Sequence, residues 1–320
     1  MVVRLSSRSL EAVNLTKQYG SFTALSDLNL KIEGSKCVGF LGPNGAGKTT
    51  TLKLFTDMIR ASKGEAIING FNVHTDKKSA LASCGVLIES PEIYPSLTPK
   101  EALSMIAEIR GIPAGERNGR IAEVMAEVKM EEWLDKKVGK FSKGMKQRIN
   151  VASSLLTDPD IVMLDEPTTG MDPRGMAEVR DIIKCMKQKG RLIFMSSHLL
   201  NEVSDVCDEV AMIDHGKLLV YDTIENVTYR FGGGLGGDVV DIMFRNPVDA
   251  GALSRISSIR NVVSAEKIDS RSVRIKFSGG LESQENLLSD LVSLRVGLVS
   301  FHPASSALED SYLNLIKESK

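Results

Sequence analysis

Gly42-Pro43-Asn44-Gly45-Ala46-Gly47-Lys48-Thr49 is the stretch that decides the fold of this chain. Four free positions separate two glycines, and a lysine and a threonine follow, which is the pattern of a phosphate-binding loop. The glycines let the backbone turn tightly, so that successive N–H groups can point at phosphate oxygens. Lys48 adds a positive charge, and the hydroxyl of Thr49 suits Mg²⁺. The stretch predicts a site for a nucleoside triphosphate with its magnesium ion; the alternative is a glycine-rich turn that matches by chance.

The flanking residues place this loop between a strand and a helix. Residues 36–41 read as a short buried strand, and residues 49–56 as a helix whose N-terminus would face the anion. Residues 13–32 alternate apolar and polar side chains around Gly20-Ser21, which predicts an antiparallel hairpin with Tyr19 beside its turn. Residues 64–70 predict another strand closed by an Asn-Gly turn.

Length and composition limit the class of protein. The chain has 320 residues, 42% hydrophobic and 25% charged, with a formal net charge of −1. Two domains are the ordinary expectation at this length. The charge offers no general attraction to nucleic acid, so no nucleic-acid partner is expected. No apolar run reaches the roughly 18–20 residues of a membrane span, and the N-terminus lacks a secretion signal, so we expect a cytoplasmic chain.

The rest of the chain predicts an α/β fold followed by a smaller α+β domain. Residues 98–156 show helical spacing and predict an α-helical subdomain. Strands and helices then alternate, which indicates a parallel sheet with ligands at the carboxyl ends of its strands. A glycine linker at 232–237 separates a nucleotide-binding domain at 1–231 from a C-terminal domain at 238–320. The β-α-β-β-α-β order of the latter, with a last helix at 308–316, resembles a ferredoxin-like unit.

Two adjacent carboxylates, Asp165 and Glu166, end a buried apolar strand. They are either a solvated acidic turn or a magnesium ligand beside a general base. Neighbouring side chains of a strand point to opposite faces, so one carboxylate could serve the metal and the other an attacking water. Phosphoryl transfer needs that arrangement, because its catalysis consists mostly of positioning and charge neutralisation. We therefore favour the catalytic interpretation.

Residues 10–220 resemble the nucleotide-binding domain of ATP-binding cassette (ABC) proteins, which are P-loop NTPases with a mixed sheet that includes an antiparallel part. Five motifs occur in the family's order: the loop at 42–49, the signature at 141–145, the acidic strand at 161–166, the D-loop at 169–172 and the switch residue His198. The signature ahead of the acidic strand separates this family from GTPases and nucleotide kinases.

The resemblance implies a role for each matching residue. Tyr19 would stack on adenine, with an ordinary turn aromatic as the alternative. Glu166 would polarise the attacking water, Lys48 would hold the β- and γ-phosphates, and His198 would contact the γ-phosphate; taken alone, His198 would read as a structural histidine. The loop residues expected at the nucleotide are Gly42, Pro43, Asn44, Gly45, Ala46, Gly47, Lys48, Thr49 and Thr50. The expected magnesium ligands are Thr49, Asp165 and Glu89.

The signature implies a shared site. In the family, its serine and second glycine, here Ser142 and Gly144, cap the ATP that the other subunit holds, and Asp172 communicates across the dimer. One chain would carry two half-sites, and a homodimer formed on ATP binding would complete both. The signature departs from the common Leu-Ser-Gly-Gly-Gln at Phe141, Lys143 and Met145, and we expect it to remain competent.

Glu89 stands where most ABC domains have glutamine. Glutamate still offers oxygen to a metal, but it adds a charge near Asp165 and Glu166. The variant resembles bacitracin- and lantibiotic-resistance exporter ATPases, with a plain surface glutamate as the alternative. The C-terminal domain resembles that of daunorubicin-type drug-exporter ATPases, whose role would be dimer support or regulation.

The predicted function is the ATP-hydrolysing subunit of an ABC exporter for drugs, peptides or lipid-like compounds. It would use ATP and Mg²⁺, associate with integral-membrane permease subunits, and sit peripherally on the inner face of the membrane. The alternatives are a soluble ABC ATPase acting on ribosomes or DNA, and a nucleotide-binding module without turnover.

Overall fold

A computed structural model describes residues 8–89, 92–231, 238–294 and 296–303, together with residues 312 and 315. The chain divides into two units, Met1–Thr223 and Ile224–Lys320. The helix before the predicted linker, α8 (Ile224–Phe231), belongs to the second unit. The predicted linker at 232–237 lies outside the described residues, as does nearly all of the helix predicted at 308–316.

An antiparallel sheet in the order β2-β1-β4-β5 forms one layer of the first unit. Its strands are β1 (Ser9–Tyr19), β2 (Phe22–Glu33), β4 (Lys63–Ile68) and β5 (Phe71–Asn72). The predicted hairpin is confirmed, because Tyr19 pairs with Phe22 across the turn. The Asn-Gly turn is also confirmed: Asn69 and Gly70, with φ of 51° and 81°, join β4 to β5 in the left-handed conformation that such a turn requires.

A six-stranded sheet in the order β10-β9-β3-β8-β7-β6 forms the centre of this unit. Its strands are β3 (Cys37–Leu41), β6 (Cys84–Leu87), β7 (Ile161–Asp165), β8 (Leu192–Ser197), β9 (Glu209–Asp214) and β10 (Lys217–Thr223). β6, β7, β8, β3 and β9 run parallel, and β10 pairs antiparallel with β9. Strands covered on both faces read as continuous apolar runs, as the sequence of β3 and β7 does.

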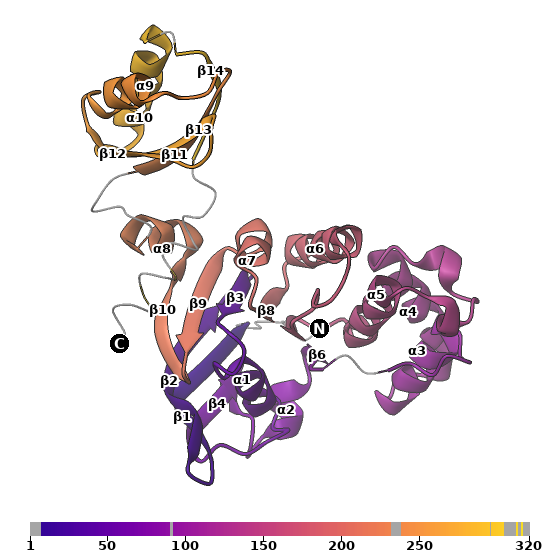
Figure 1. Ribbon diagram of the computed structural model, residues 1–320. Helices are drawn as coiled ribbons and strands as arrows, with labels where there is room; N and C mark the ends of the chain where they lie inside the picture. Colours follow the sequence, from indigo (N-terminus) through magenta and orange to yellow (C-terminus); the bar gives the residue numbers. More distant parts are fainter. Residues whose placement is uncertain are drawn as a thin grey trace. The chain divides into compact units, whose positions relative to one another are not determined.

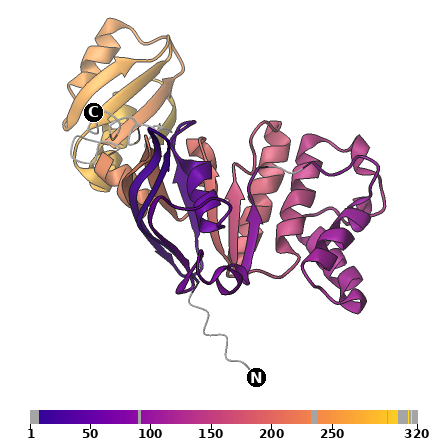
Figure 2. The same ribbon diagram turned by 90° about the horizontal axis from the view of Figure 1, so that it is seen from below.

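Seven α-helices accompany these sheets in the described part of the unit. They are α1 (Lys48–Phe55), α2 (Lys77–Leu81), α3 (Pro99–Ile109), α4 (Ala114–Glu127), α5 (Lys143–Leu155), α6 (Pro173–Gln188) and α7 (Leu200–Val206), with 3₁₀ turns at Glu131–Trp133 and Val138–Lys140. Figures 1 and 2 show α3, α4 and α5 grouped beyond the β6 edge, away from the antiparallel strands. Within the described residues, none of the helices is long and apolar enough to cross a membrane.

One core joins the two sheets of the first unit through α1. It contains buried side chains from β1, β2 and β4 as well as from β3, β7 and β8. The Phe194 ring lies at its centre, 5.3 Å from Phe40 and 6.1 Å from Phe55, measured between ring centroids. This packing fixes α1, and with it the loop at its N-terminus, against the carboxyl ends of the central strands.

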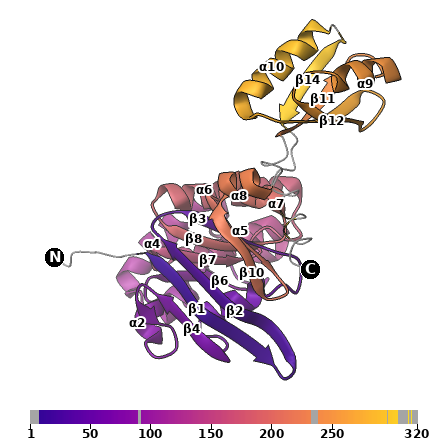
Figure 3. The ribbon, with the colours of Figure 1, turned by 90° about the vertical axis from the view of Figure 1, so that its left-hand side faces the viewer.

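The second unit contains a four-stranded antiparallel sheet in the order β12-β13-β11-β14. Its elements after α8 are β11 (Asp238–Phe244), α9 (Ala250–Ser257), β12 (Val262–Lys267), β13 (Ser272–Phe277), α10 (Gly280–Ser293) and β14 (Leu298–Pro303). Their order is the predicted one. Val240, Ile242 and Ile275 of the sheet share a buried core with Ile256 of α9 and Leu287 of α10 (Figure 3).

Candidate functional site: a phosphate loop and a carboxylate cluster

The loop between β3 and α1 has a backbone that only glycine tolerates at key positions. Gly47 precedes α1 with φ of 109°, and Gly45 has φ of 84°. A Cβ atom on Gly42 would lie 2.3 Å from the carbonyl oxygen of Ile213, and one on Gly47 would lie 2.7 Å from that of Ala24. Glycine is therefore required at 42 and 47 by the close approach of neighbouring backbone, and at 45 and 47 by the positive φ. These glycines allow the tight backbone turn that a phosphate-binding loop needs.

Lys48 folds back over this loop. Its side chain is only 5% exposed, and its Nζ atom donates to the carbonyl oxygens of Gly42 at 2.8 Å and Pro43 at 3.1 Å. The same ammonium lies 3.3 Å from Oε1 of Glu166. A cation held inside a ring of backbone groups at a helix N-terminus is suited to a phosphate chain.

Thr49 and Asp165 meet beside the loop. The Thr49 hydroxyl donates to Oδ2 of Asp165 at 2.9 Å, and the Ser196 hydroxyl donates to Oδ1 of the same carboxylate at 2.5 Å. Hydroxyl and carboxylate oxygens are the donors that Mg²⁺ prefers, so this pair fits the ion that accompanies a nucleotide.

Glu166 lies at the centre of a second group of contacts. Its Oε2 atom accepts from the Thr169 hydroxyl at 2.6 Å and lies 2.7 Å from Nδ1 of His198, while its Oε1 faces Lys48. Burial opposes ionisation of this carboxyl, but the Thr169 hydroxyl, Lys48 and His198 outweigh it and lower the pKa of Glu166. The carboxylate is therefore ionised at neutral pH and able to accept a proton.

The two carboxylates face different partners for a reason other than strand alternation. β7 ends at Asp165, and Glu166 leaves the strand in the left-handed region with φ of 44°. A non-glycine residue in this conformation carries strain of a kind that clusters at functional sites. The turn directs Asp165 toward α1 and Glu166 toward Lys48 and His198.

Glu89, the third residue expected at the metal, pairs with a lysine in this structure, so its role as a magnesium ligand beside Thr49 and Asp165 stays a prediction. It follows β6 with φ of 54°, and its carboxylate lies 2.6 Å from Nζ of Lys53 on α1. The Glu89 side chain is 72% exposed. The ion pair with Lys53 directs the added charge to the surface of α1.

Tyr19 ends β1 as a half-exposed ring, with Nζ of Lys17 located 4.9 Å from the ring centroid. The exposed ring leaves aromatic surface for stacking. In the described part of the chain, no hydrogen bond or ion pair joins Tyr19 to the phosphate loop, so adenine stacking stays a prediction.

Ser142 and Gly144 begin helix α5. The Ser142 Oγ atom accepts from the backbone N–H of Met145 at 3.2 Å and caps the helix. Gly144 is buried against α6, where a Cβ atom would lie 3.5 Å from the Cα of Gly175. Asp172 stands at the N-cap position of α6. Within the described residues, no hydrogen bond or ion pair joins these three residues to the phosphate loop, and their role at the ATP of a second copy stays a prediction.

Several site residues were missed by sequence reasoning. Ser196 holds Asp165 and also accepts from the backbone N–H of Glu166 at 2.9 Å, and Thr169 holds the Glu166 carboxylate. Lys53 pairs with Glu89. The only sequence signal for Ser196 was a polar residue at the end of an apolar strand, which many strands share.

Comparison with known proteins identifies close likenesses. Residues 25–169 match a family model described as ABC transporter. The bacitracin transport ATP-binding protein BcrA of Bacillus licheniformis is 41% identical over 214 residues, covering 67% of this chain and 69% of that protein. The linearmycin resistance ATP-binding protein LnrL of Bacillus subtilis (strain 168) is 28% identical over 310 residues, covering 96% and 97%. A solved structure of an ATP-binding subunit of an ABC transporter superposes with a TM-score of 0.62 at 28% identity, covering 70% of this chain and 93% of that one.

Proposed function

This chain belongs to the ABC transporter family as an ATP-binding, ATP-hydrolysing subunit, and we propose that it powers an exporter of antibiotic-like compounds through separate membrane subunits. The observation that carries the catalytic assignment is the position of Glu166, whose ionised carboxylate contacts Lys48, Thr169 and His198 beside the phosphate loop. The transport assignment rests on the family and on relatives named for bacitracin transport and linearmycin resistance.

The residues of the phosphate loop and those at the strand ends have different roles in hydrolysis. The loop amides and Lys48 bind the phosphates, and Thr49 with Asp165 would hold Mg²⁺, which neutralises phosphate charge when it is bound. Glu166 accepts a proton from the attacking water, and His198 holds the Glu166 carboxylate in place through Nδ1. The Thr169 hydroxyl donates to the same Oε2 atom of Glu166 that His198 contacts.

Ser142 and Gly144 would complete the site of a second copy. The N-terminus of α5 carries the positive end of a helix dipole and an exposed serine hydroxyl, and both suit a γ-phosphate. Because each chain holds one loop and one such helix start, a two-fold dimer would form two equivalent sites. ATP would close this dimer and hydrolysis would open it, and that motion would drive the membrane partner.

The membrane partner is inferred from the family. Tyr94, Met105 and Ile109 are exposed apolar side chains, two of them on α3, in the helical part of the first unit. We assign this surface to a cytoplasmic helix of the permease subunits, which would place the chain peripherally on the inner face of the membrane. Copurification from detergent-solubilised membranes with a multi-spanning protein is the expected result; association with ribosomes or DNA and with no membrane protein would favour the soluble alternative.

Steady-state turnover of ATP tests the catalytic assignment. Glu166→Gln keeps the size of the side chain and removes its ability to accept a proton, so kcat should fall by about 10²- to 10⁴-fold with ATP binding retained. Glu65→Gln, on the exposed part of β4, is the matched control and should keep wild-type turnover. Unchanged turnover in Glu166→Gln would remove Glu166 as the base.

A further inference from the structure

Glu202 is a buried carboxyl group that the proposed mechanism does not use. It lies in the first turn of α7 with 2% of its surface exposed. Its Oε1 accepts from the Thr168 hydroxyl, and its Oε2 accepts from the Ser197 hydroxyl at 2.8 Å. Thr168 and Ser197 are each 1% exposed, so the group is sealed from solvent. Buried polar groups that satisfy each other in this way specify one local arrangement.

The two hydroxyls belong to the segments that carry the catalytic residues. Thr168 lies in the turn between Glu166 and Thr169, and the Thr169 hydroxyl donates to Glu166 at 2.6 Å. Ser197 is the residue before His198, whose Nδ1 lies 2.7 Å from the same carboxylate oxygen. Glu202 therefore joins the segment that carries Glu166 to the segment that carries His198.

Ser197 extends the connection to the phosphate loop. Its carbonyl oxygen accepts from the backbone N–H of Gly42 at 3.3 Å, and its hydroxyl oxygen accepts from the backbone N–H of Leu199 at 2.9 Å. The turn that carries His198 is thus fixed by two backbone N–H groups, those of Gly42 and Leu199, and by the Glu202 carboxylate. Loss of the Glu202 oxygens would leave the buried Thr168 hydroxyl without this acceptor, and would leave the Ser197 hydroxyl with the more distant carbonyl oxygen of Leu199 at 3.4 Å.

We propose that Glu202 is a positioning residue for ATP hydrolysis, which sets Glu166 and His198 at their working separation by holding Thr168 and Ser197. This inference rests on the proposed roles of Glu166 and His198. Among the described residues, no hydrogen bond or ion pair joins Glu202 to Lys48 or Thr49, so its loss acts on the hydrolysis step much more than on ATP binding.

The test compares Glu202→Gln with a second buried carboxylate of the same unit. Glu202→Gln keeps the shape and replaces one acceptor oxygen by a donor, so the two hydroxyls cannot both donate to it. Glu127→Gln is the matched control, because the Glu127 side chain is 3% exposed and pairs with Arg191 and Lys189, before the start of β8, whereas His198 follows the end of β8. ATP turnover and ATP affinity are measured per folded molecule for both variants.

We expect kcat of Glu202→Gln to fall about ten- to hundredfold, the effect of misplacing a catalytic group by a fraction of an ångström to an ångström. Its Kd for ATP should stay within about threefold, and Glu127→Gln should keep wild-type kcat even if it unfolds more easily. If Glu202→Gln does not fold, Thr168→Val removes one hydroxyl at nearly constant shape and should lower kcat in the same way.

Two results overturn the proposal. Wild-type kcat in Glu202→Gln, or in Thr168→Val where the first variant does not fold, contradicts a positioning role. An equal loss of kcat in Glu127→Gln means that the loss reflects general destabilisation. Failure of the proposed role of Glu166 is distinguished by Glu166→Gln, which would then keep wild-type turnover whatever Glu202→Gln does.

Discussion

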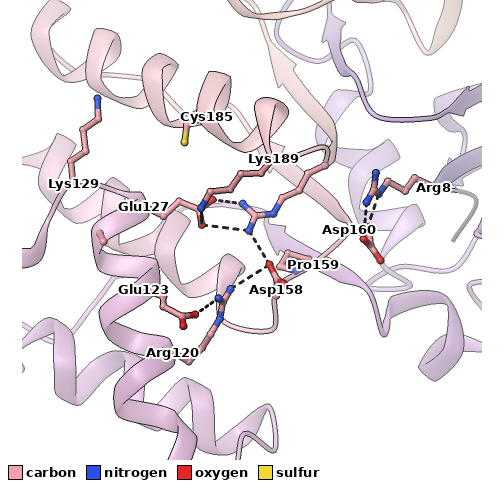
Figure 4. Close-up of a pocket in the computed structure, with 12 residues that line it drawn as sticks. Arg8, Arg120, Glu123, Glu127, Lys129, Asp158, Pro159, Asp160, Cys185 and Lys189 are labelled. Atoms are coloured by element: carbon pink, nitrogen blue, oxygen red, sulfur yellow. Dashed lines mark hydrogen bonds and ion pairs between the residues drawn. The ribbon is translucent and has the colours of Figure 1, made fainter. Parts of the chain in front are cut away.

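Removal of the Glu127 carboxylate should weaken the attachment of the helical part of the first unit to its central sheet. Glu127 ends α4, and its side chain is 3% exposed. It pairs with Arg191, which is 6% exposed and precedes β8, and with Nζ of Lys189 at 2.8 Å. Arg191 also lies 3.1 Å from Oδ1 of Asp158. Figure 4 shows Glu127, Asp158 and Lys189 among the side chains that line one cavity. Arg191, which pairs with both carboxylates, lines the same cavity.

The loss of unfolding free energy in Glu127→Ala depends on which partners Arg191 keeps. Breaking a buried ion pair by removing one partner costs about 3–5 kcal/mol, because the other charge stays buried. In Glu127→Ala, Asp158 still pairs with Arg191, so we expect the lower end, about 3 kcal/mol. With a urea m-value of about 2–3 kcal/mol/M for a unit of this size, the midpoint should fall by about 1 M. The double variant Glu127→Ala with Arg191→Met removes the buried guanidinium that has lost one of its two carboxylate partners, and should be more stable than Glu127→Ala alone.

Urea unfolding followed by Trp133 fluorescence measures this change. Trp133 is the single tryptophan of the chain, and it lies in the helical part, with its ring 5.4 Å from that of Phe141. ATP turnover per folded molecule should be unaffected. A midpoint within about 0.3 M of wild type, or a double variant less stable than the single one, would refute the reasoning.

The pH dependence of the stability difference between wild type and Glu127→Ala tests the same ion pair. Burial opposes ionisation of Glu127, but its bonds with Arg191 and Lys189 outweigh that effect and lower the pKa of Glu127. Its contribution to stability is therefore complete above the pKa of glutamate in the unfolded chain, about 4.3, and is lost as the pH falls through the lower folded value. The difference between wild type and Glu127→Ala should be constant from pH 7 to about 5 and shrink in more acidic solution; a difference that grows on acidification would contradict this.

Three further outcomes concern the phosphate loop and its metal. Lys48→Ala removes the only cation that the described structure places within the loop, and titration with a fluorescent ATP analogue should show affinity at least about tenfold weaker; equal affinity would contradict its role. Thr49→Ala removes one oxygen of the proposed metal pair, so the Mg²⁺ concentration for half-maximal turnover should rise, and an unchanged requirement would exclude that ligand. Glu89→Gln removes an exposed pair with Lys53 worth about 0–1 kcal/mol, so its thermal midpoint and Mg²⁺ requirement should both match wild type; an Mg²⁺ requirement raised as in Thr49→Ala would support Glu89 as the third metal ligand.

The phosphate loop was predictable because its chemistry is local. Gly45 and Gly47 adopt the left-handed conformations that their spacing indicated, and Lys48 follows directly on the chain. The strands were predictable for a similar reason, since buried parallel strands read as apolar runs. The polar residues after such runs could then be expected at one edge of the sheet.

The supporting contacts were not predictable, because they join segments that are far apart in the sequence. Ser196 meets Asp165 across 31 positions, and Glu202 meets Thr168 across 34. Each depends on the pairing of β7 with β8 and on the packing of α7, neither of which leaves a local pattern.

Glu89 shows the limit of reasoning from a slot in a motif. The resemblance placed Glu89 in the slot of the family's glutamine, and in the structure it follows β6, at one edge of the central sheet. Its direction depends on a backbone φ of 54° and on Lys53, a residue of α1 with no motif of its own. The position of a residue along a strand could be predicted, but the partner of its side chain required the fold.

The shared site is tested most directly by sedimentation velocity of the Glu166→Gln variant with saturating ATP and Mg²⁺. We expect a monomer with ADP and a dimer with ATP, because binding then persists without hydrolysis. Addition of Gly144→Asp should return this dimer to monomers, since a Cβ atom is tolerated at Gly144 but a carboxylate would repel the partner's γ-phosphate. A Glu166→Gln protein that stays monomeric with ATP, or that dimerises equally well with Gly144→Asp, would contradict the two half-sites assigned to this chain.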